Sequence, residues 1–369
     1  MRRGTHLAVV AVLLIGACSG GPPDGYNPDY VAFPTVQRPA VRAVAAPATT
    51  GSAEPAVPIG PPATLADVSQ RLLAAAPRAG FLRAELTDAG NCSPVAGLAR
   101  DVPLPVASVF KLYVLGAVVA AVQDRQIDWG SRILIRDELD SLPSGKTQHE
   151  PAGSRLSVRE LARRMIQLSD NTATDHLIDL VGRTAVEQAV VDMDHSSPAL
   201  MRPLLTTRDL FVLKSNPEVM ARYVAADKEG RRTMLLGEVH DAALPDYSDL
   251  WREPREITEV EWLASPSDVC AAMAAVDRMG RTRGHEIVAT IMSTDASSRF
   301  GSGTFDAVLY KSGREPGVLF DAWLAIEPGG KRIVMVGGVA DDDAVVDQHL
   351  SELLQAGLTL DTIRPADPA

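Results

Sequence analysis

The sequence is poor in the residues that hold small or metal-bound proteins together. It has 3 cysteines in 369 residues, too few for a scaffold built on disulfides, and no paired Cys/His motif has the spacing of a zinc site. The histidines show neither H-E-x-x-H nor H-x-H spacing, which argues against a metallohydrolase. We therefore expect no bound metal and a fold that is stabilised by an apolar core.

Basic residues are in the minority. Lys and Arg total 36 against 47 Asp and Glu, so the formal net charge is -11. A nucleic-acid-binding protein needs a broad basic face that neutralises phosphates. This composition therefore argues against nucleic acid or polyphosphate as a partner.

Long apolar runs are scarce as well, and the one at the N-terminus is too short to span a bilayer permanently. Arg2 and Arg3 precede an apolar stretch over residues 7–17, and two small residues stand directly before Cys18. This pattern resembles a bacterial lipobox, which predicts a lipoprotein signal peptide over residues 1–17 and a diacylated Cys18. Such a cysteine would anchor the protein to the extracytoplasmic face of the cell membrane. An ordinary secretory peptide with an incidental cysteine is the alternative.

Residues 18–63 are rich in Pro, Ala, Gly, Thr and Val. A stretch of this composition cannot bury enough apolar area to order itself, so we expect a partly extended tether. The folded domain is predicted over residues 64–369. No internal repeat is visible.

Apolar periodicity places strands near both ends of this domain and helices between them. The predicted strands cover residues 81–86, 305–310, 318–326 and 332–339. The predicted helices cover residues 64–77, 108–123, 157–168, 171–181, 207–213, 266–278 and 341–356, the last with the acidic run 341–343 as its cap. The economical architecture is α+β: an antiparallel sheet from both termini, flanked by helices, with a helical subdomain over residues 108–280.

Ser108 and Lys111 are the first candidate catalytic residues along the chain. They lie three residues apart at the start of a predicted apolar helix, so the amine can approach the hydroxyl. At the N-terminus of a helix, the dipole would favour a developing alkoxide. The S-x-x-K pattern is weak evidence by itself, because four-residue patterns arise by chance.

Two further motifs follow in order. Residues 169–171 read Ser-Asp-Asn between two predicted helices, and residues 311–313 read Lys-Ser-Gly at the end of a predicted strand. Together with Ser108 and Lys111, they resemble the S-x-x-K, S-D-N and K-[ST]-G motifs of class A β-lactamases and penicillin-recognising serine enzymes. The resemblance covers most of the chain after residue 64 and implies a β-lactamase-like fold.

The resemblance implies a role for each matching residue. Ser108 would be the nucleophile that attacks an amide, lactam or ester carbonyl, and Lys111 would accept its proton. Ser169 would pass a proton toward the leaving nitrogen. Asn171 would bind the substrate amide and help to position Lys111, while Asp170 would satisfy backbone groups in its own turn.

The third motif supplies the remaining contacts that the resemblance implies. Lys311 would add positive potential beneath a substrate carboxylate, Ser312 would contribute a hydroxyl, and Gly313 completes the substrate-binding set. The backbone N–H groups of Ser108 and Arg314 would hold the oxyanion. Because the chain itself supplies the nucleophile, proton shuttle and oxyanion donors, no cofactor is implied.

The sequence departs from the family at the base that hydrolyses the acyl-enzyme. Class A enzymes carry an E-x-x-L-N segment after S-D-N, and none stands between residues 181 and 266. Glu259 and Glu261 are the candidates nearest to the family position, but we interpret them as surface carboxylates before a helix. Turnover of penicillins is therefore expected to be weak or absent.

An enlarged insertion is predicted over residues 193–261. Residues 264–273 resemble the family's helix that begins T-T-P and continues A-M-A. The competing match at residues 205–209 is interpreted as the start of a capped helix within the insertion. Cys92 and Cys270 could form a disulfide or remain buried thiols, and the sequence leaves both open.

The sequence thus predicts a membrane-anchored, exported serine hydrolase that forms an acyl-enzyme at Ser108 with a β-lactam, ester or peptide-like amide. One alternative is a D-alanyl-D-alanine carboxypeptidase, or penicillin-binding protein, of cell-wall maintenance. Another is a non-catalytic envelope lipoprotein that binds a wall or lipid ligand. The expected partners are a small-molecule or peptidoglycan-like substrate and the membrane, and the sequence does not indicate the oligomeric state.

Overall fold

The computed structural model describes residues 61–151, 153–294 and 300–360. The predicted signal peptide, the Cys18 lipidation site and nearly all of the tether lie outside these ranges. Within them, no helix has the length and apolar character needed to cross a membrane.

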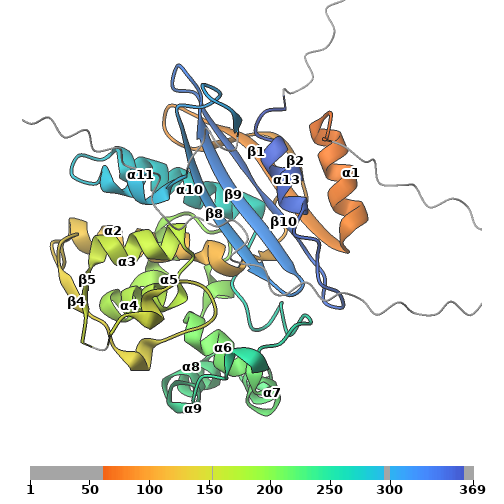
Figure 1. Cartoon of the computed structure of the whole chain (residues 1–369). Coiled ribbons are helices and arrows are strands. Elements are labelled where there is room, and N and C mark those ends of the chain that lie inside the picture. The colour runs from red at the N-terminus through yellow and green to blue at the C-terminus, as the bar shows by residue number, and fades with distance from the viewer. Residues whose placement is uncertain (1–60, 152, 295–299, 361–369) are drawn as a thin grey trace, which may run out of the picture.

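A six-stranded antiparallel sheet is built from both ends of the domain, as predicted (Figure 1). Its order is β2-β1-β10-β9-β8-β7. The strands are β1 (Arg78–Leu86), β2 (Cys92–Leu98), β7 (Ser293–Thr294), β8 (Ala307–Glu315), β9 (Val318–Ile326) and β10 (Arg332–Ala340). The N-terminal strand β1 pairs with β10 over eight residues, which joins the two ends of the chain. The fold is therefore mixed α+β and β-lactamase-like, as the sequence predicted.

Both faces of the sheet are covered, which explains why its central strands read as nearly continuous apolar runs. In β9, Leu319 and Trp323 contribute to an outer core, whereas Phe320 and Leu324 contribute to an inner one. The outer core packs beneath α1 (Leu65–Ala75) and α13 (Leu350–Ala356). The inner core joins the sheet to the helices on its other side. The result is a three-layered domain (Figure 1).

The helical subdomain surrounds α2 (Lys111–Gln123), in which ten of thirteen residues are buried. Two short strand pairs accompany it. β3 (Leu104–Pro105) pairs with β6 (Leu263–Ala264) where the subdomain meets the sheet, and β4 (Arg132–Leu134) pairs with β5 (Arg155–Ser157) within the subdomain. Its other helices are α3 (Val158–Gln167), α4 (Asn171–Val181), α5 (Arg183–Asp192), α10 (Pro266–Arg281) and α11 (Ile287–Met292).

The predicted insertion is also helical. It contains α6 (Thr207–Ser215), α7 (Pro217–Ala225), α8 (Lys228–Leu236) and α9 (Glu238–Asp241). The sequence offered two matches to the start of one family helix, at residues 205–209 and 264–273. Both segments begin a helix with a capping box, Thr206 with Asp209 in α6 and Ser265 with Asp268 in α10. The interpretation of residues 205–209 as a capped helix start within the insertion is confirmed.

Two predicted elements need correction. The final helix does not begin at the acidic run, because the Asp341 carboxylate accepts hydrogen bonds from the backbone N–H groups of Asp343 and Ala344 and forms a turn instead. Helix α13 starts only at Leu350. Strand β8 continues five residues beyond the predicted end at residue 310 and therefore includes the whole Lys-Ser-Gly motif.

The two cysteines of the folded domain form a disulfide. Cys92 on the edge strand β2 is bonded to Cys270 in the middle of α10. Of the two possibilities that the sequence left open, the structure has the disulfide, which joins the sheet to the inner helical layer.

Candidate active site

Ser108 lies in a single 3-10 turn, η2 (Ala107–Phe110), directly before α2. The turn is held from one side by residue Trp262, whose ring stacks on Phe110 with centroids 3.8 Å apart and whose carbonyl accepts from the N–H of Val106. Ala107 has φ 43°, a conformation that costs a residue with a Cβ about 1–2 kcal/mol. Such strain concentrates at functional sites, where the surrounding structure must enforce it.

The amine of Lys111 is fully buried one turn after Ser108. It donates hydrogen bonds to the carbonyl of Ser169 at 2.6 Å, to the Ser169 hydroxyl at 3.3 Å and to Oδ1 of Asn171 at 2.6 Å. Burial lowers the pKa of Lys111 to about 7, and the carboxylates of Asp170 and Asp175 oppose this shift only in part. At a pH near 7, a large fraction of the molecules therefore carries a neutral amine at this position.

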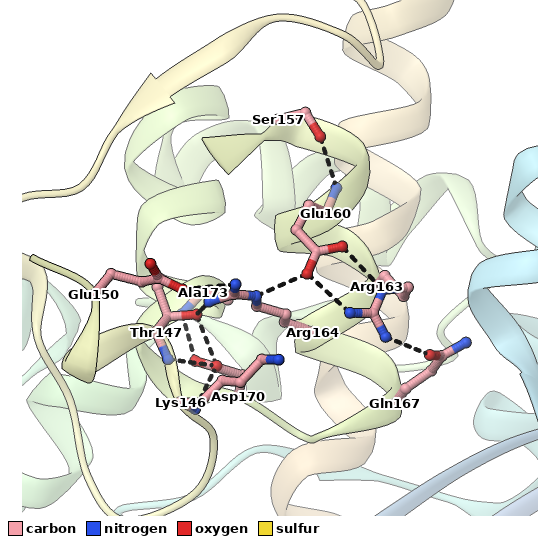
Figure 2. Close-up of polar contacts among 10 residues, drawn as sticks. All are labelled: Lys146, Thr147, Glu150, Ser157, Glu160, Arg163, Arg164, Gln167, Asp170 and Ala173. Carbon is pink, nitrogen blue, oxygen red and sulfur yellow. Dashed lines mark hydrogen bonds and ion pairs between the residues drawn. The ribbon is translucent and has the colours of Figure 1, made fainter. Parts of the chain in front are cut away.

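Ser169 is presented by a tight turn that Asp170 holds in place. The Asp170 carboxylate caps α4 by accepting from the N–H of Ala173, and it also accepts from the N–H groups of Lys146 and Thr147 (Figure 2). Ser169 itself has φ 52°. Asp170 therefore satisfies backbone groups around the turn, as expected from its place in the motif.

A second group of ionic contacts supports this turn from α3. Arg164 donates to the Thr147 hydroxyl and forms ion pairs with Glu150 and Glu160, which links the loop at 147–150 to the helix before Ser169 (Figure 2). Hydrogen bonds from the guanidinium groups of Arg163 and Arg164 lower the pKa of Glu160 to about 2. Glu160 therefore remains charged throughout the physiological range.

Both ends of the Asn171 amide are used within the protein. Its Oδ1 accepts from Lys111, and its Nδ2 donates to the carbonyl of Leu142 at 2.8 Å. The predicted positioning of Lys111 by Asn171 thus has a direct geometric counterpart. A contact from Nδ2 to a substrate amide would have to compete with, or share, the bond to Leu142.

Lys311 reaches the same serine from the sheet. Its buried amine donates to the Ser169 hydroxyl at 3.0 Å and to the carbonyl of Ser312 at 2.6 Å. Burial, together with the nearby charges of Lys111 and Arg314, places the pKa of Lys311 well below its ordinary value. The structure therefore gathers Lys111, Ser169, Asn171 and Lys311 into one connected group.

Gly313 brings strand β8 against the turn that contains Ser108. A Cβ at this position would lie 2.0 Å from the carbonyl oxygen of Val106 and 3.0 Å from the backbone nitrogen of Ser108, so no side chain fits. In the described part of the chain, β7 pairs only with Val308 and Leu309, which leaves this edge of β8 beyond residue 309 without a strand partner. The glycine therefore allows the backbone of β8 to approach the turn of Ser108 closely.

The side chain of Arg314 points away from this contact. Strand alternation places it on the opposite face from Gly313, where Nη2 makes two bonds to the buried carboxylate of Asp321, at 2.9 and 3.0 Å. Ser312 lies half-buried on the same face as Arg314. Arg314 therefore leaves only its backbone to the site, and the oxyanion role of its N–H stays a prediction.

The two candidate deacylation bases lie elsewhere. Glu259 is half-exposed and pairs with Arg231 at 2.8 Å, as expected of a surface carboxylate. The same expectation is wrong for Glu261, which is buried because its neighbours Val260 and Trp262 belong to the core. Neither glutamate belongs to the described hydrogen-bonded group around Ser169.

Sequence reasoning missed three charged residues beside the site. Glu315 ends β8 and pairs with Lys214 from α6, and Asp321 binds Arg314. Asp321 had a signal in the sequence, because it is the one charged residue in the apolar strand over residues 318–326. Lys214 and Glu315 are separated by 101 residues, and nothing local in the sequence pairs them.

The arrangement contains groups of the kinds that acyl transfer uses. The half-buried hydroxyl of Ser108 lies one helical turn before the partly neutral amine of Lys111. A second hydroxyl bridges two amines, and the backbone of β8 passes beside Ser108. Among the described residues, no group of three or more His, Cys, Asp or Glu side chains is placed to hold a metal ion.

Sequence comparison identifies the family. The profile of the Beta-lactamase enzyme family matches residues 64–356, nearly the whole of the predicted domain. The chain belongs to the β-lactamase enzyme family. No curated protein matches it.

Solved structures of β-lactamase-like proteins share the fold at low identity. A β-lactamase from Sphaerobacter thermophilus DSM 20745 is 21% identical, with a TM-score of 0.54 over 80% of this chain and 94% of that chain. PBP-A is 21% identical, with a TM-score of 0.52 over 81% and 96%. A β-lactamase from Chitinophaga pinensis DSM 2588 is 19% identical, with a TM-score of 0.54 over 79% and 94%. These likenesses establish the β-lactamase fold for this family member.

Proposed function

We propose that this member of the β-lactamase family is a serine hydrolase that forms an acyl-enzyme at Ser108. The observation that carries the proposal is the convergence of Lys111 and Lys311 on the hydroxyl of Ser169, beside the turn that presents Ser108. Two buried amines with lowered pKa values and a shared hydroxyl make a proton-transfer centre.

Acylation follows from this geometry. The neutral amine of Lys111 accepts the proton of the Ser108 hydroxyl as its oxygen attacks the substrate carbonyl carbon. The N–H groups of Ser108 and Arg314 stabilise the oxyanion that forms. As the carbonyl is restored, the bond to the leaving nitrogen or oxygen breaks, and that atom takes a proton from the Ser169 hydroxyl. The protonated Lys111 then returns a proton to Ser169, so charge and protons balance.

Deacylation is proposed to be slow. Hydrolysis of the ester needs a base that activates water, and the two candidates are engaged elsewhere, Glu259 with Arg231 and Glu261 next to Lys214. The structural neighbours include a point mutant of PBP-A as an acyl-enzyme complex with penicillin G. A long-lived acyl-enzyme fits a penicillin-binding role in cell-wall maintenance, with a D-alanyl-D-alanine peptide as substrate, as the second candidate function.

The proposal includes export and anchoring. A signal peptide over residues 1–17 and a lipidated Cys18 would place the domain outside the cytoplasmic membrane, where peptidoglycan-like and β-lactam substrates occur. The disulfide between Cys92 and Cys270 supports an oxidising location.

Steady-state and single-turnover kinetics on the domain from residue 64 onward distinguish these substrates. The panel is penicillin G, a cephalosporin, a p-nitrophenyl ester and a peptide ending in D-Ala-D-Ala. We expect rapid acylation and slow release with the β-lactams, both abolished in Ser108→Ala. Release of D-alanine at a rate above that of β-lactam hydrolysis would favour the carboxypeptidase, and equal behaviour of Ser108→Ala and wild type would overturn the enzymatic proposal.

A further inference from the structure

Two successive residues of β8 are fixed by ion pairs on opposite faces of the sheet. Arg314 points to the outer face and pairs with Asp321 of β9. Glu315 points to the inner face and pairs with Lys214 of α6. All four side chains are at least about nine-tenths buried.

The inner pair connects the insertion to the end of the strand. The Lys214 amine donates to both carboxylate oxygens of Glu315, at 2.7 and 2.8 Å, and lies 5.8 Å from the ring centre of Trp251. Glu261 is the neighbouring titratable group, with one oxygen 3.9 Å from Lys214 and the other accepting from the N–H of Trp262. Lys214 thus connects three parts of the chain. These are α6 itself, the segment of Glu261 and Trp262 that supports the turn of Ser108, and the end of β8.

The outer pair is equally constrained. The Asp321 carboxylate accepts from Arg314, from the hydroxyl of Tyr310 at 2.9 Å and from the hydroxyl of Ser351 in α13 at 2.5 Å. Arg314 Nη1 also donates to the carbonyls of Gly313 and Phe320. The guanidinium is therefore bonded to backbone on both β8 and β9.

These ion pairs lie on either side of the peptide group between Gly313 and Arg314, which carries one of the two proposed oxyanion donors. The N–H of Arg314 belongs to the peptide group that follows Gly313, and Gly313 is the residue pressed against Val106 and Ser108. Beyond residue 309 this edge of β8 has no strand partner in the described part of the chain, so only the pairing with β9 on the other edge holds the strand there. Side chains bonded on both faces can prevent the strand from rolling about its axis.

We propose that Lys214 and Asp321 are positioning residues that hold the Arg314 N–H toward Ser108. Lys214 acts through Glu315 and Asp321 acts through the side chain of Arg314. The inference rests on the proposed function and extends it, because it gives the insertion a part in acylation. It also explains the use of ion pairs here, since a buried ion pair is seldom more stabilising than apolar side chains of similar volume.

The test separates positioning from stability. Replacing one partner would leave an unpaired buried charge and could unfold the domain, so the main variant is the double substitution Lys214→Met with Glu315→Leu, which keeps the volume and removes both charges. The control is Arg183→Met, which breaks another largely buried ion pair to the same helix α6 and does not touch β8. Its partner Asp209 keeps the hydrogen bond from the backbone N–H of Thr206. The melting temperature is measured for each variant.

Two readouts report on the oxyanion site. One is the acylation rate constant at saturating penicillin G, and the other is the affinity for an arylboronic acid, which forms a tetrahedral adduct with the serine and so requires the same donors. In the double variant we expect both to fall by about 10- to 100-fold, somewhat less than the loss of an oxyanion donor causes. The dissociation constant of the initial non-covalent complex should remain within about 3-fold, because non-covalent binding precedes formation of the oxyanion.

Acylation and boronate affinity in the double variant that match those of wild type, or that fall no further than in Arg183→Met, would overturn the inference. Asp321→Asn tests the outer pair by the same two readouts, with Ser351→Ala as its control for a lost neutral bond. If wild-type protein neither acylates nor binds the boronic acid, the proposed function fails first and this inference fails with it. Wild-type reaction with an unaffected double variant refutes the positioning role alone.

Discussion

The amines of Lys111 and Lys311 bind the same oxygen atom, the hydroxyl of Ser169, at 3.3 and 3.0 Å. Burial lowers the pKa values of both amines, and the nearby charges of Lys111 and Arg314 lower that of Lys311 further. Near neutral pH, the amines of Lys111 and Lys311 together therefore carry less positive charge than two exposed lysines would. This property suits a centre that accepts one proton and returns it within a single catalytic event.

The rate of acylation should rise with pH through about 7. Lys111 is the proposed base, its pKa is about 7, and only its neutral form can accept the serine proton. The measurement is the second-order rate constant for acylation by penicillin G between pH 5 and 9. Lys111→Arg should remove the rise together with nearly all activity, because an arginine stays protonated. A wild-type profile that is flat between pH 6 and 8 would show that Lys111 is not the base.

Ser169→Gly should be more stable than Ser169→Ala by about 1 kcal/mol. Both variants lose the hydroxyl, but only glycine adopts φ 52° without a penalty from its Cβ. Urea unfolding of the two variants side by side measures the difference, and both should be acylated far more slowly than wild type. An alanine variant as stable as the glycine variant would mean that the turn relaxes and carries no strain.

Gly313→Ala should slow acylation strongly and lower the free energy of unfolding. The added Cβ would lie 2.0 Å from the Val106 carbonyl oxygen, so β8 and the nucleophile turn must separate. We expect acylation to fall by at least about 100-fold, the magnitude of losing an oxyanion donor. Gly237→Ala, between α8 and α9, is the control for an added methyl group, because a Cβ there would meet only the Thr233 carbonyl oxygen at 3.5 Å, and it should leave acylation unchanged. Unaltered acylation in Gly313→Ala would contradict the close approach of these segments.

Removing the disulfide should destabilise the domain without changing the acylation chemistry. Cys92 and Cys270 are 178 residues apart, so the bond restricts the unfolded chain considerably, and its loss should cost about 2–5 kcal/mol. The comparison is urea unfolding of wild type and of Cys92→Ala with Cys270→Ala, while the acylation rate below the transition serves as the control. Equal stability of the two proteins would show that the bond adds nothing to the folded state.

The sequence predicted those parts of the fold in which apolar pattern and structure agree. The strand over residues 318–326 was predicted to the residue, because both of its faces are buried. Strand β2 was not predicted, because its sequence contains Pro94 and small residues and most of its side chains are exposed at the sheet edge. The second half of β8 was missed because its polar residues break the alternation. They are tolerated there because Lys311, Arg314 and Glu315 each have a polar partner: Ser169, Asp321 and Lys214.

The site was predictable as far as its motifs extend. The grouping of Lys111, Ser169, Asn171 and Lys311 was expected from their resemblance to the family, and the structure places them together. The partners of Arg314 and Glu315 were not predictable, because a register between strands and a contact with the insertion place them there. The burial of Glu261 was missed for the same reason, since it depends on a core that distant segments complete.

The most direct test of this account is the intact mass of the domain after exposure to penicillin G, beside that of its Ser108→Ala variant. The account predicts that wild-type protein gains the mass of one penicillin, that the modified peptide contains Ser108, that the adduct persists for many minutes because no base activates water, and that the variant gains nothing. An adduct on both proteins, or a modified peptide that lacks Ser108, would contradict the assignment of Ser108 as the nucleophile.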